Sequence, residues 1–256
     1  MGDPKAVQKC HHEPPSIPTD CRDCAIREAT LCGALSKDQL GILQEFKTCD
    51  RIVPAHTHLY RAGERLNEIY NLLSGWVSLY RILESGRRQV LQIELPGAFL
   101  GYQARLDDPL HHGAECLTDV AVCVFPRRAF PDLLERHPLL GLKLLGMMAH
   151  DVVRSHDQLT NVGGRSGMER VAHFLLQIYL RLRHQQHALN GDTLALPLTQ
   201  EMIGDALGLT PVHINRILRQ LRERRLVVLH NRTLQVLDLE GLRRMAEVPQ
   251  LDPAEP

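Results

Sequence analysis

The chain has 256 residues, 44% of them hydrophobic, and its 30 basic and 30 acidic residues give a formal net charge of zero. This length allows two packed domains with tails, and the neutral total gives no overall sign of a nucleic-acid-binding protein. No stretch approaches the roughly 20 uninterrupted apolar residues of a membrane helix, and the N-terminus does not resemble a signal peptide, so we expect a cytoplasmic protein without membrane contact.

The first predicted unit, residues 1–36, is a polar, proline-bearing segment rich in cysteine. Cys21, Cys24 and Cys32 form the pattern C-x2-C-x7-C, which allows one loop to wrap three thiolates around a metal centre. Without an export signal, a disulfide framework is disfavoured because the cytosol keeps thiols reduced. Thiolates are soft ligands, so zinc and an iron-sulfur cluster are both reasonable occupants.

The three N-terminal cysteines need a fourth ligand from elsewhere in the chain. Cys116 and Cys123 are the two candidates, although a lone cysteine on a strand is commonly a small core residue. Cys10 and Cys49 belong to no such pattern, and we expect no function for them.

Residues 37–137 carry the signals of an antiparallel β domain. Four glycines recur 11 or 12 residues apart, at Gly63, Gly75, Gly86 and Gly97, as expected for turns between strands. Two runs alternate with period two. In the first, Leu91, Ile93 and Leu95 are expected on one face with Gln92 and Glu94 on the other. In the second, Val120, Val122 and Val124 alternate with Ala121, Cys123 and Phe125.

Residues 138–164 change to a helical period, and Gly163 and Gly164 are expected to end the helix. Apolar positions step by three and four like the a and d positions of a heptad: Leu142, Leu145, Ala149, Val152, His156 and Leu159. This stripe suits pairing with a second copy of the helix. Packing against the chain's own β domain explains the periodicity equally well.

Residues 165–248 form the predicted DNA-binding domain, followed by a tail at 249–256. Ten arginines, no lysine and five acidic residues lie between Arg165 and Arg232, a local positive excess that favours a polyanion. Ser166 and Glu169 have the spacing of a capping box. Residues 226–236, around Asn231, are typical of a hairpin wing.

Two short helices joined by a tight turn are predicted within this domain. Thr199 caps the first and Thr210 the second, which opens with Pro211, and Gly208 supplies the turn. The second helix can enter the major groove, where Asn reads adenine and Arg reads guanine. An arginine-rich solvated helix is the simpler alternative. The predicted DNA-contacting residues are Thr199, Gln200, Thr210, Val212, His213, Asn215, Arg216, Arg219 and Arg222.

This order of elements, with the stretch QEMIGDALGLTPVHINRILRQL at 200–221, resembles the superfamily of the cyclic-AMP receptor and the fumarate-nitrate-reduction regulator. The resemblance implies an α+β fold with a cyclic-nucleotide-binding-like jelly roll, a dimerisation helix and a winged helix-turn-helix. It also implies a homodimer that binds double-stranded DNA at an inverted repeat and acts with RNA polymerase.

Within that superfamily, the N-terminal cysteines resemble the oxygen-sensing branch, whose members hold a [4Fe-4S] cluster with three such cysteines and one from the β-roll. The fourth lies just before a strand-ending proline, and the match VCVFP assigns it to Cys123, with Cys116 in reserve. Two features depart from this branch: the last cysteine gap is longer than in its best-known members, and Val212 replaces a base-reading glutamate.

The cyclic-nucleotide-binding members carry Gly-Glu and later Arg-Ser in their phosphate cassette. This chain has Gly101-Tyr102 and then Asp107-Asp108, which disfavours a cyclic-AMP sensor.

We therefore predict a transcription regulator, not an enzyme, that is controlled by oxygen or redox state through the cluster. Alternatives are the same regulator with zinc, haem or a small-molecule effector, and, more remotely, an iron-sulfur or zinc enzyme. No Gly-rich phosphate loop, nucleophile elbow or His-Glu zinc motif supports the enzyme.

Overall fold

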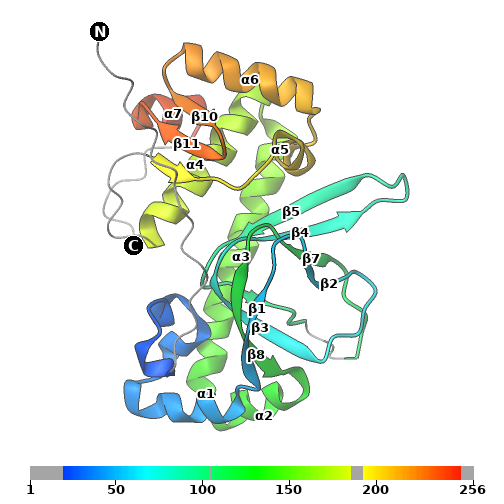
Figure 1. Ribbon diagram of the computed structural model, residues 1–256, viewed down its shortest axis with the longest axis vertical. Coiled ribbons are helices and arrows are strands. Elements are labelled where there is room, and N and C mark those ends of the chain that lie inside the picture. Colours follow the sequence, from blue (N-terminus) through cyan, green and yellow to red (C-terminus); the bar gives the residue numbers. More distant parts are fainter. Residues whose placement is uncertain (1–19, 104, 106, 186–192, 249–256) are drawn as a thin grey trace.

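The computed structural model describes residues 20–103, 105, 107–185 and 193–248, so Cys10 and the predicted tail at 249–256 lie outside it. A long helix, α3 (Pro138–Gly164), runs through the molecule, with a β domain around its first half and a smaller domain around its end (Figure 1). Before the β domain come short turns of 3-10 helix and one α-helix: Cys21–Asp23, Arg27–Ala29, Leu31–Ala34, Lys37–Gln39 and α1 (Leu40–Phe46).

The β domain consists of two four-stranded antiparallel sheets, in the orders β1-β8-β3-β6 and β2-β7-β4-β5. All four predicted turn glycines have positive φ, between 79° and 100°, a region that glycine enters without steric cost. The prediction of an antiparallel β-roll is confirmed. The strands are β1 (Cys49–Val53), β2 (His58–Tyr60), β3 (Glu68–Ser74), β4 (Val77–Ile82), β5 (Arg88–Glu94), β6 (Phe99–Leu100), β7 (Gly113–Cys116) and β8 (Val120–Pro126).

Strand β8 separates two hydrophobic cores. Its three valines join the core between the two sheets, which also contains Cys116. Cys123 and its neighbours Ala121 and Phe125 join a second core, the outer-sheet core, which lies on the outer face of the β1-β8-β3-β6 sheet. The predicted alternation is confirmed, and both of its faces are buried.

Strand β5 does not follow the predicted alternation. An irregularity in the β4–β5 register pairs Leu79 with Gln92 but Tyr80 with Val90, so Val90 and Ile93 are buried while Leu91 is only half-buried. Glu94, which period two placed opposite the core face, is only 3% exposed. A β-bulge inserts one residue and breaks the two-residue repeat, and ion pairs compensate the burial of the carboxylate.

Helix α3 follows η5 (Arg127–Ala129) and α2 (Phe130–Arg136). It includes Gly163 and Gly164 and stops at the extended residue Arg165. One side of its first half packs on the outer-sheet core through Leu140 and Leu144. In the described part of the chain, no helix has both the length and the apolar character needed to span a bilayer.

The C-terminal domain begins with α4 (Gly167–Gln185), whose start shows the predicted capping box: the Ser166 amide donates to Glu169 Oε2 at 2.7 Å. A three-stranded sheet in the order β10-β11-β9 forms the wing. Asn231 and Arg232 make its turn with φ of 49° and 57°, as hairpin turns of this kind require. The predicted winged helix-turn-helix is present. Its other elements are β9 (Thr193–Ala195), α5 (Gln200–Leu207), α6 (Pro211–Glu223), β10 (Val227–His230), β11 (Thr233–Val236) and α7 (Leu239–Met245).

Candidate metal centre and nucleic-acid interface

Short capped turns fix the backbone of the cysteine segment. The Asp20 carboxylate accepts a hydrogen bond from the Arg22 amide at 2.8 Å, and the Thr30 hydroxyl accepts one from the Cys32 amide at 3.2 Å. Gly33 packs so close to the chain that a Cβ there would lie 2.7 Å from the Glu28 carbonyl oxygen. The segment is therefore folded tightly on itself, although it has little apolar side-chain volume of its own.

The structure brings the four predicted cysteine ligands to one place. Cys123 is buried in the outer-sheet core, and Cys21, Cys24 and Cys32 pack against the same core at its edge. The Asn71 side chain connects the two groups, because its Nδ2 lies 3.7 Å from Cys32 Sγ and the residue pairs with Cys123 across β3 and β8.

The other described cysteines face elsewhere. Cys116 is buried in the core between the sheets, and Cys49 packs at the edge of that core. Because β8 and its sheet separate this core from the N-terminal segment, the geometry favours Cys123 over Cys116 as the fourth ligand.

Burial raises the pKa of three of the candidate ligand thiols. It raises the pKa of Cys21, and it raises the pKa of Cys32, with smaller contributions in the same direction from Cys21 and Cys24. The pKa of Cys123 is raised by burial and by the neighbouring Asp50. Thiols in such surroundings stay protonated in the absence of a cation, and binding of a metal centre would release their protons.

The donor set fits a thiolate-ligated cluster. Within residues 20–103, 105, 107–185 and 193–248, no three His, Cys, Asp or Glu side chains lie close enough to bind one metal ion between them. A [4Fe-4S] cluster joins each cysteine to a different iron, so its ligands do not have to meet at one point. Four cysteines at one apolar core, with a buried amide aimed at one sulfur, provide ligands and a hydrogen-bond donor for such a group.

The cysteine segment is also attached to α3. Lys143 Nζ donates to the Glu28 carbonyl oxygen at 3.1 Å, and Leu31 and Leu35 share a core with Leu140 and Leu144 of the helix. Any change in the packing of the segment therefore acts directly on the first half of α3.

The predicted dimerisation stripe lies on the opposite side of α3 from this contact. Its six residues are all exposed in the single chain, with Leu142, Leu145 and Leu159 between 65% and 68% exposed and Val152 52% exposed. The β-roll contact thus uses other residues, and the stripe remains available to a second copy.

The helix-turn-helix has the predicted caps. Thr199 accepts from the Met202 amide at 3.1 Å and Thr210 from the His213 amide at 3.3 Å. Gly208 ends α5 with a φ of +67°. At Gly204 a Cβ would lie 2.4 Å from the Leu209 carbonyl oxygen, so the close turn depends on glycine there.

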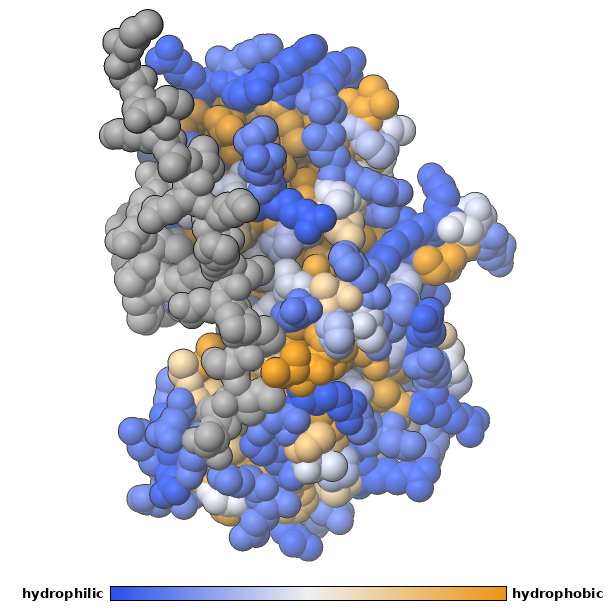
Figure 2. Space-filling model, in the orientation of Figure 1, coloured by the Kyte–Doolittle hydropathy of each residue, from blue (hydrophilic) through white to orange (hydrophobic). Residues whose placement is uncertain are grey.

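One face of α6 is exposed and rich in arginine. Val212 is 80% exposed, and Asn215, Arg216, Arg219 and Arg222 follow it on the same side. Asn215 Nδ2 donates to Gln200 Oε1 at 3.3 Å, which brings α5 beside the start of this face. Figure 2 shows the surface over α6 as mostly hydrophilic, with a hydrophobic patch at its right-hand end.

His213 is the exception among the predicted α6 residues. It is half-buried, and its ring lies so near Gly167 that a Cβ there would come within 3.2 Å of it. The ring faces the start of α4, away from the exposed face.

Sequence reasoning missed the junction between the two domains. Glu94 of β5 pairs with Arg154 of α3 at 3.1 Å and with Arg181 of α4 at 3.6 Å. Burial lowers the pKa of Arg181 to about 10, so it stays charged at neutral pH. The period-two alternation only placed Glu94 on the face opposite to Ile93 and Leu95, and no pattern in the sequence pointed to this contact.

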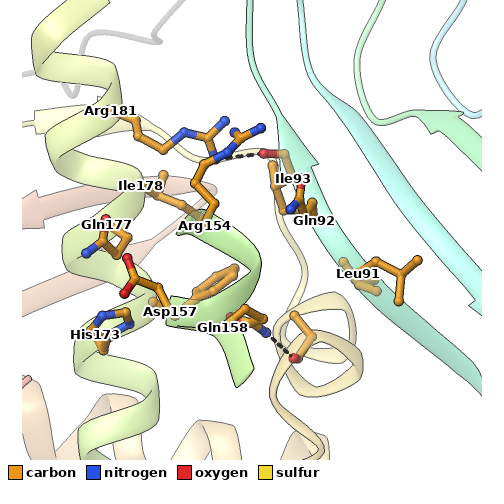
Figure 3. A pocket seen from close by; sticks show the side chains of 13 residues that line it. Leu91, Gln92, Ile93, Arg154, Asp157, Gln158, His173, Gln177, Ile178 and Arg181 are labelled. Atoms are coloured by element: carbon orange, nitrogen blue, oxygen red, sulfur yellow. Dashed lines mark hydrogen bonds between the residues drawn. The ribbon is translucent and has the colours of Figure 1, made fainter. Parts of the chain in front are cut away.

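A small cavity of about 90 Å³ lies at the same junction. Figure 3 shows Asp157 of α3 facing His173 and Gln177 of α4, with Gln158 pointing away from them and β5 across from the two helices. Gln158 Nε2 donates to the Ala206 carbonyl oxygen at 2.8 Å. The last turn of α5 is therefore tied to the long helix.

Comparisons with known proteins agree with this architecture. Residues 50–137 match the family Cyclic nucleotide-binding domain, and residues 169–245 match the Crp-like helix-turn-helix domain. The nitrogen fixation regulation protein FixK of Bradyrhizobium diazoefficiens is 31% identical, covering 88% of this chain and 93% of FixK. The transcriptional activator protein FnrL of Cereibacter sphaeroides is 26% identical, covering 86% of this chain and 89% of FnrL.

Among solved structures, FixK2 from Bradyrhizobium japonicum superimposes with a TM-score of 0.70 at 27% identity. The match covers 77% of this chain and 96% of FixK2.

Proposed function

Because the chain belongs to the FNR-like branch of the CRP/FNR superfamily of DNA-binding transcription regulators, we propose that oxygen or redox state controls it through a [4Fe-4S] cluster. Its relatives are transcription regulators rather than enzymes. The ligands in this proposal are Cys21, Cys24, Cys32 and Cys123.

The observation that carries the proposal is the gathering of these four cysteines around one apolar core. They come from two segments 91 or more positions apart in sequence, and the other described cysteines contact a different core. The cluster would supply the redox chemistry, since oxygen or nitric oxide is expected to convert or destroy it.

The chain's own residues would connect the cluster to DNA binding. Lys143 holds the cysteine segment on α3 by its hydrogen bond to Glu28, and Leu140 and Leu144 hold it by apolar contacts. Further along α3, Gln158 holds the end of α5. Loss of order in the segment would therefore change the packing of the helix that carries both the dimer stripe and a contact to the helix-turn-helix.

We assign dimerisation to the exposed stripe of α3 and DNA contact to the exposed face of α6. Val212, Asn215 and Arg216 lie near the N-terminus of α6, where base edges are reachable, and Arg219 and Arg222 lie where phosphates are closer. A symmetric dimer would bind an inverted repeat. A regulator of this kind would act together with RNA polymerase at the promoter.

A small organic effector is the second candidate for the signal. A cleft of about 950 Å³ lies between the β5–β6 connection and α3, and Tyr102, His112, Lys143 and His150 are among the residues that line it. Both arginines at this cleft, Arg154 and Arg181, pair with Glu94. Their charges are therefore partly neutralised and attract an anionic ligand less strongly.

The experiment that tests the proposal is purification without air, followed by a visible absorption spectrum with iron, sulfide and zinc analysis. We expect four irons and four sulfides per chain and a broad visible absorption. Exposure to air should abolish both this absorption and the affinity for DNA. Stoichiometric zinc, a haem spectrum, or a colourless protein that binds DNA equally well with and without air would contradict it.

A further inference from the structure

A row of paired residues crosses the outer sheet at the level of Cys123. Cys123 of β8 pairs with Asp50 of β1 on one side and with Asn71 of β3 on the other. Asn71 in turn pairs with Phe99 of β6. Paired residues on neighbouring strands have side chains on the same face of a sheet. Cys123 is therefore flanked by two polar side chains on a face whose other members are mainly apolar.

The two polar neighbours differ in what they can offer to a thiolate. Asp50 accepts a hydrogen bond from Lys47 Nζ at 2.7 Å, and an ionised carboxylate has only acceptors. The Asn71 amide has two donors, and its Nδ2 lies 3.7 Å from Cys32 Sγ. Of the two, only Asn71 can donate to a ligand sulfur.

Burial of the Asn71 amide costs free energy of solvation, and packing alone does not explain why an amide is buried here. The residue is 1% exposed, and its Oδ1 has no hydrogen-bond partner among the described residues. An apolar residue of similar size would avoid the loss of solvation. The hydrogen bond to Cys32 is the only side-chain hydrogen bond of its amide within the described ranges, so it is the natural reason for an amide at this position.

We propose that Asn71 is a positioning residue for the cysteine site, which holds the Cys32 sulfur beside the Cys123 strand and tunes the bound cluster. This inference rests on the proposed function. Hydrogen bonds to the sulfurs are among the features that set the reduction potential of an iron-sulfur cluster, and outer-shell partners orient the ligands. A donor draws electron density from sulfur and stabilises the reduced form, so its removal lowers the potential.

The test compares the full chain with Asn71→Leu, which keeps the number of side-chain heavy atoms and removes the donor, and with Asn71→Asp, which keeps the shape. Each protein is purified without air and assayed for iron, sulfide, midpoint potential and the lifetime of the visible absorption in air-saturated buffer. We expect both variants to have a lower potential and a lifetime about tenfold shorter, within the range for loss of an outer-shell partner.

Asn161→Leu is the matched control, because Asn161 is also fully buried but lies on α3 and donates to the Arg170 carbonyl oxygen. It should leave the potential and the lifetime unchanged. An equal change in this control would overturn the inference, since the effect would then reflect loss of any buried amide.

The two possible failures are distinguishable. A wild-type chain without iron and sulfide would overturn the proposed function and this inference together. A wild-type chain with the cluster, combined with unchanged potential and lifetime in both Asn71 variants, would overturn this inference alone.

Discussion

The cysteine segment at 20–36 and the winged helix-turn-helix at 165–248 are ordered in different ways. The second has a core formed mostly by its own helices and sheet, with Ile203, Ile214 and Leu234 fully buried, although β-roll residues such as Val90 and Ile93 join it. Side chains cap α5 and α6. The first consists of 3-10 turns and depends on the β-roll and α3 for its apolar contacts.

The difference shows where sensitivity to a signal can be built into one chain. A domain whose core comes mainly from its own elements keeps its shape when conditions change, because most of its burial and its helix caps are internal. A segment that borrows its core and carries metal-ligand side chains can lose order when a ligand is lost, since metal binding and folding are coupled. The following changes separate these two behaviours.

The largest effect is expected from Cys123→Ser compared with Cys116→Ser. Cys123→Ser should abolish the iron and sulfide content and make the N-terminal segment sensitive to limited proteolysis, while α4 to α7 remain protected. Cys116, whose pKa burial raises to about 12, is a core residue, so Cys116→Ser should keep its cluster. The opposite result would move the fourth ligand to Cys116.

The next effect concerns the helix that joins the two regions. Val152→Glu places a charge in the exposed stripe of α3, where a second copy would bury it unpaired. Sedimentation should show a monomer, and affinity for operator DNA should fall together with dimerisation. His150→Glu, also exposed on α3 but outside the stripe, should remain a dimer. An intact dimer in Val152→Glu would place the interface elsewhere.

A smaller effect is expected from pH, through His173 at the domain junction. The residue is 5% exposed, and burial lowers its pKa from 6.5 to about 4, with Arg165 adding to the shift and Asp157 opposing it. The unfolded chain therefore binds a proton between pH 6.5 and 4 that the folded chain does not. The stability from this residue is present above pH 6.5 and lost as pH falls, by about 3 kcal/mol in total.

Denaturant unfolding at pH 7 and at pH 5 measures this contribution. The loss of unfolding free energy should be smaller in His173→Gln than in the wild type, since glutamine does not titrate. Equal losses in the two proteins would show that His173 is not buried in its neutral form.

Much of the fold was predictable because its signals are local. The turn glycines, the caps at Thr199 and Thr210 and the alternation in β8 each depend on neighbours in the sequence. The convergence of the four cysteines was not visible in their spacing, and placing Cys123 with them depended on the resemblance of VCVFP to a known pattern.

What could not be predicted depends on contacts between distant segments. Glu94 is buried because a bulge changes the register of β5 and because Arg154 and Arg181 arrive from two helices. His213 has helical spacing suited to the groove, yet it faces Gly167, 46 positions earlier in the chain. Asn71 has no feature in its own strand that distinguishes it from a solvent-facing residue.

The last and smallest effects concern how the DNA-binding region reads its operator, which should be independent of the cysteine segment once the dimer is formed. Arg216→Ala should cost about 1–3 kcal/mol of discrimination between base pairs at one position of the half-site. Arg222→Ala should weaken binding to all sequences alike and lower the salt slope by about one. Arg222 is the better phosphate probe because Arg219 also pairs with Glu223 at 3.8 Å.

Val212 can contact a thymine methyl but cannot accept from cytosine, so we expect a half-site that differs from that of regulators with glutamate there. Selection from random DNA, followed by salt titration of each variant, measures both roles. Unchanged sequence preference in Arg216→Ala, or recovery of the glutamate-type half-site by the wild type, would show that other residues read the bases.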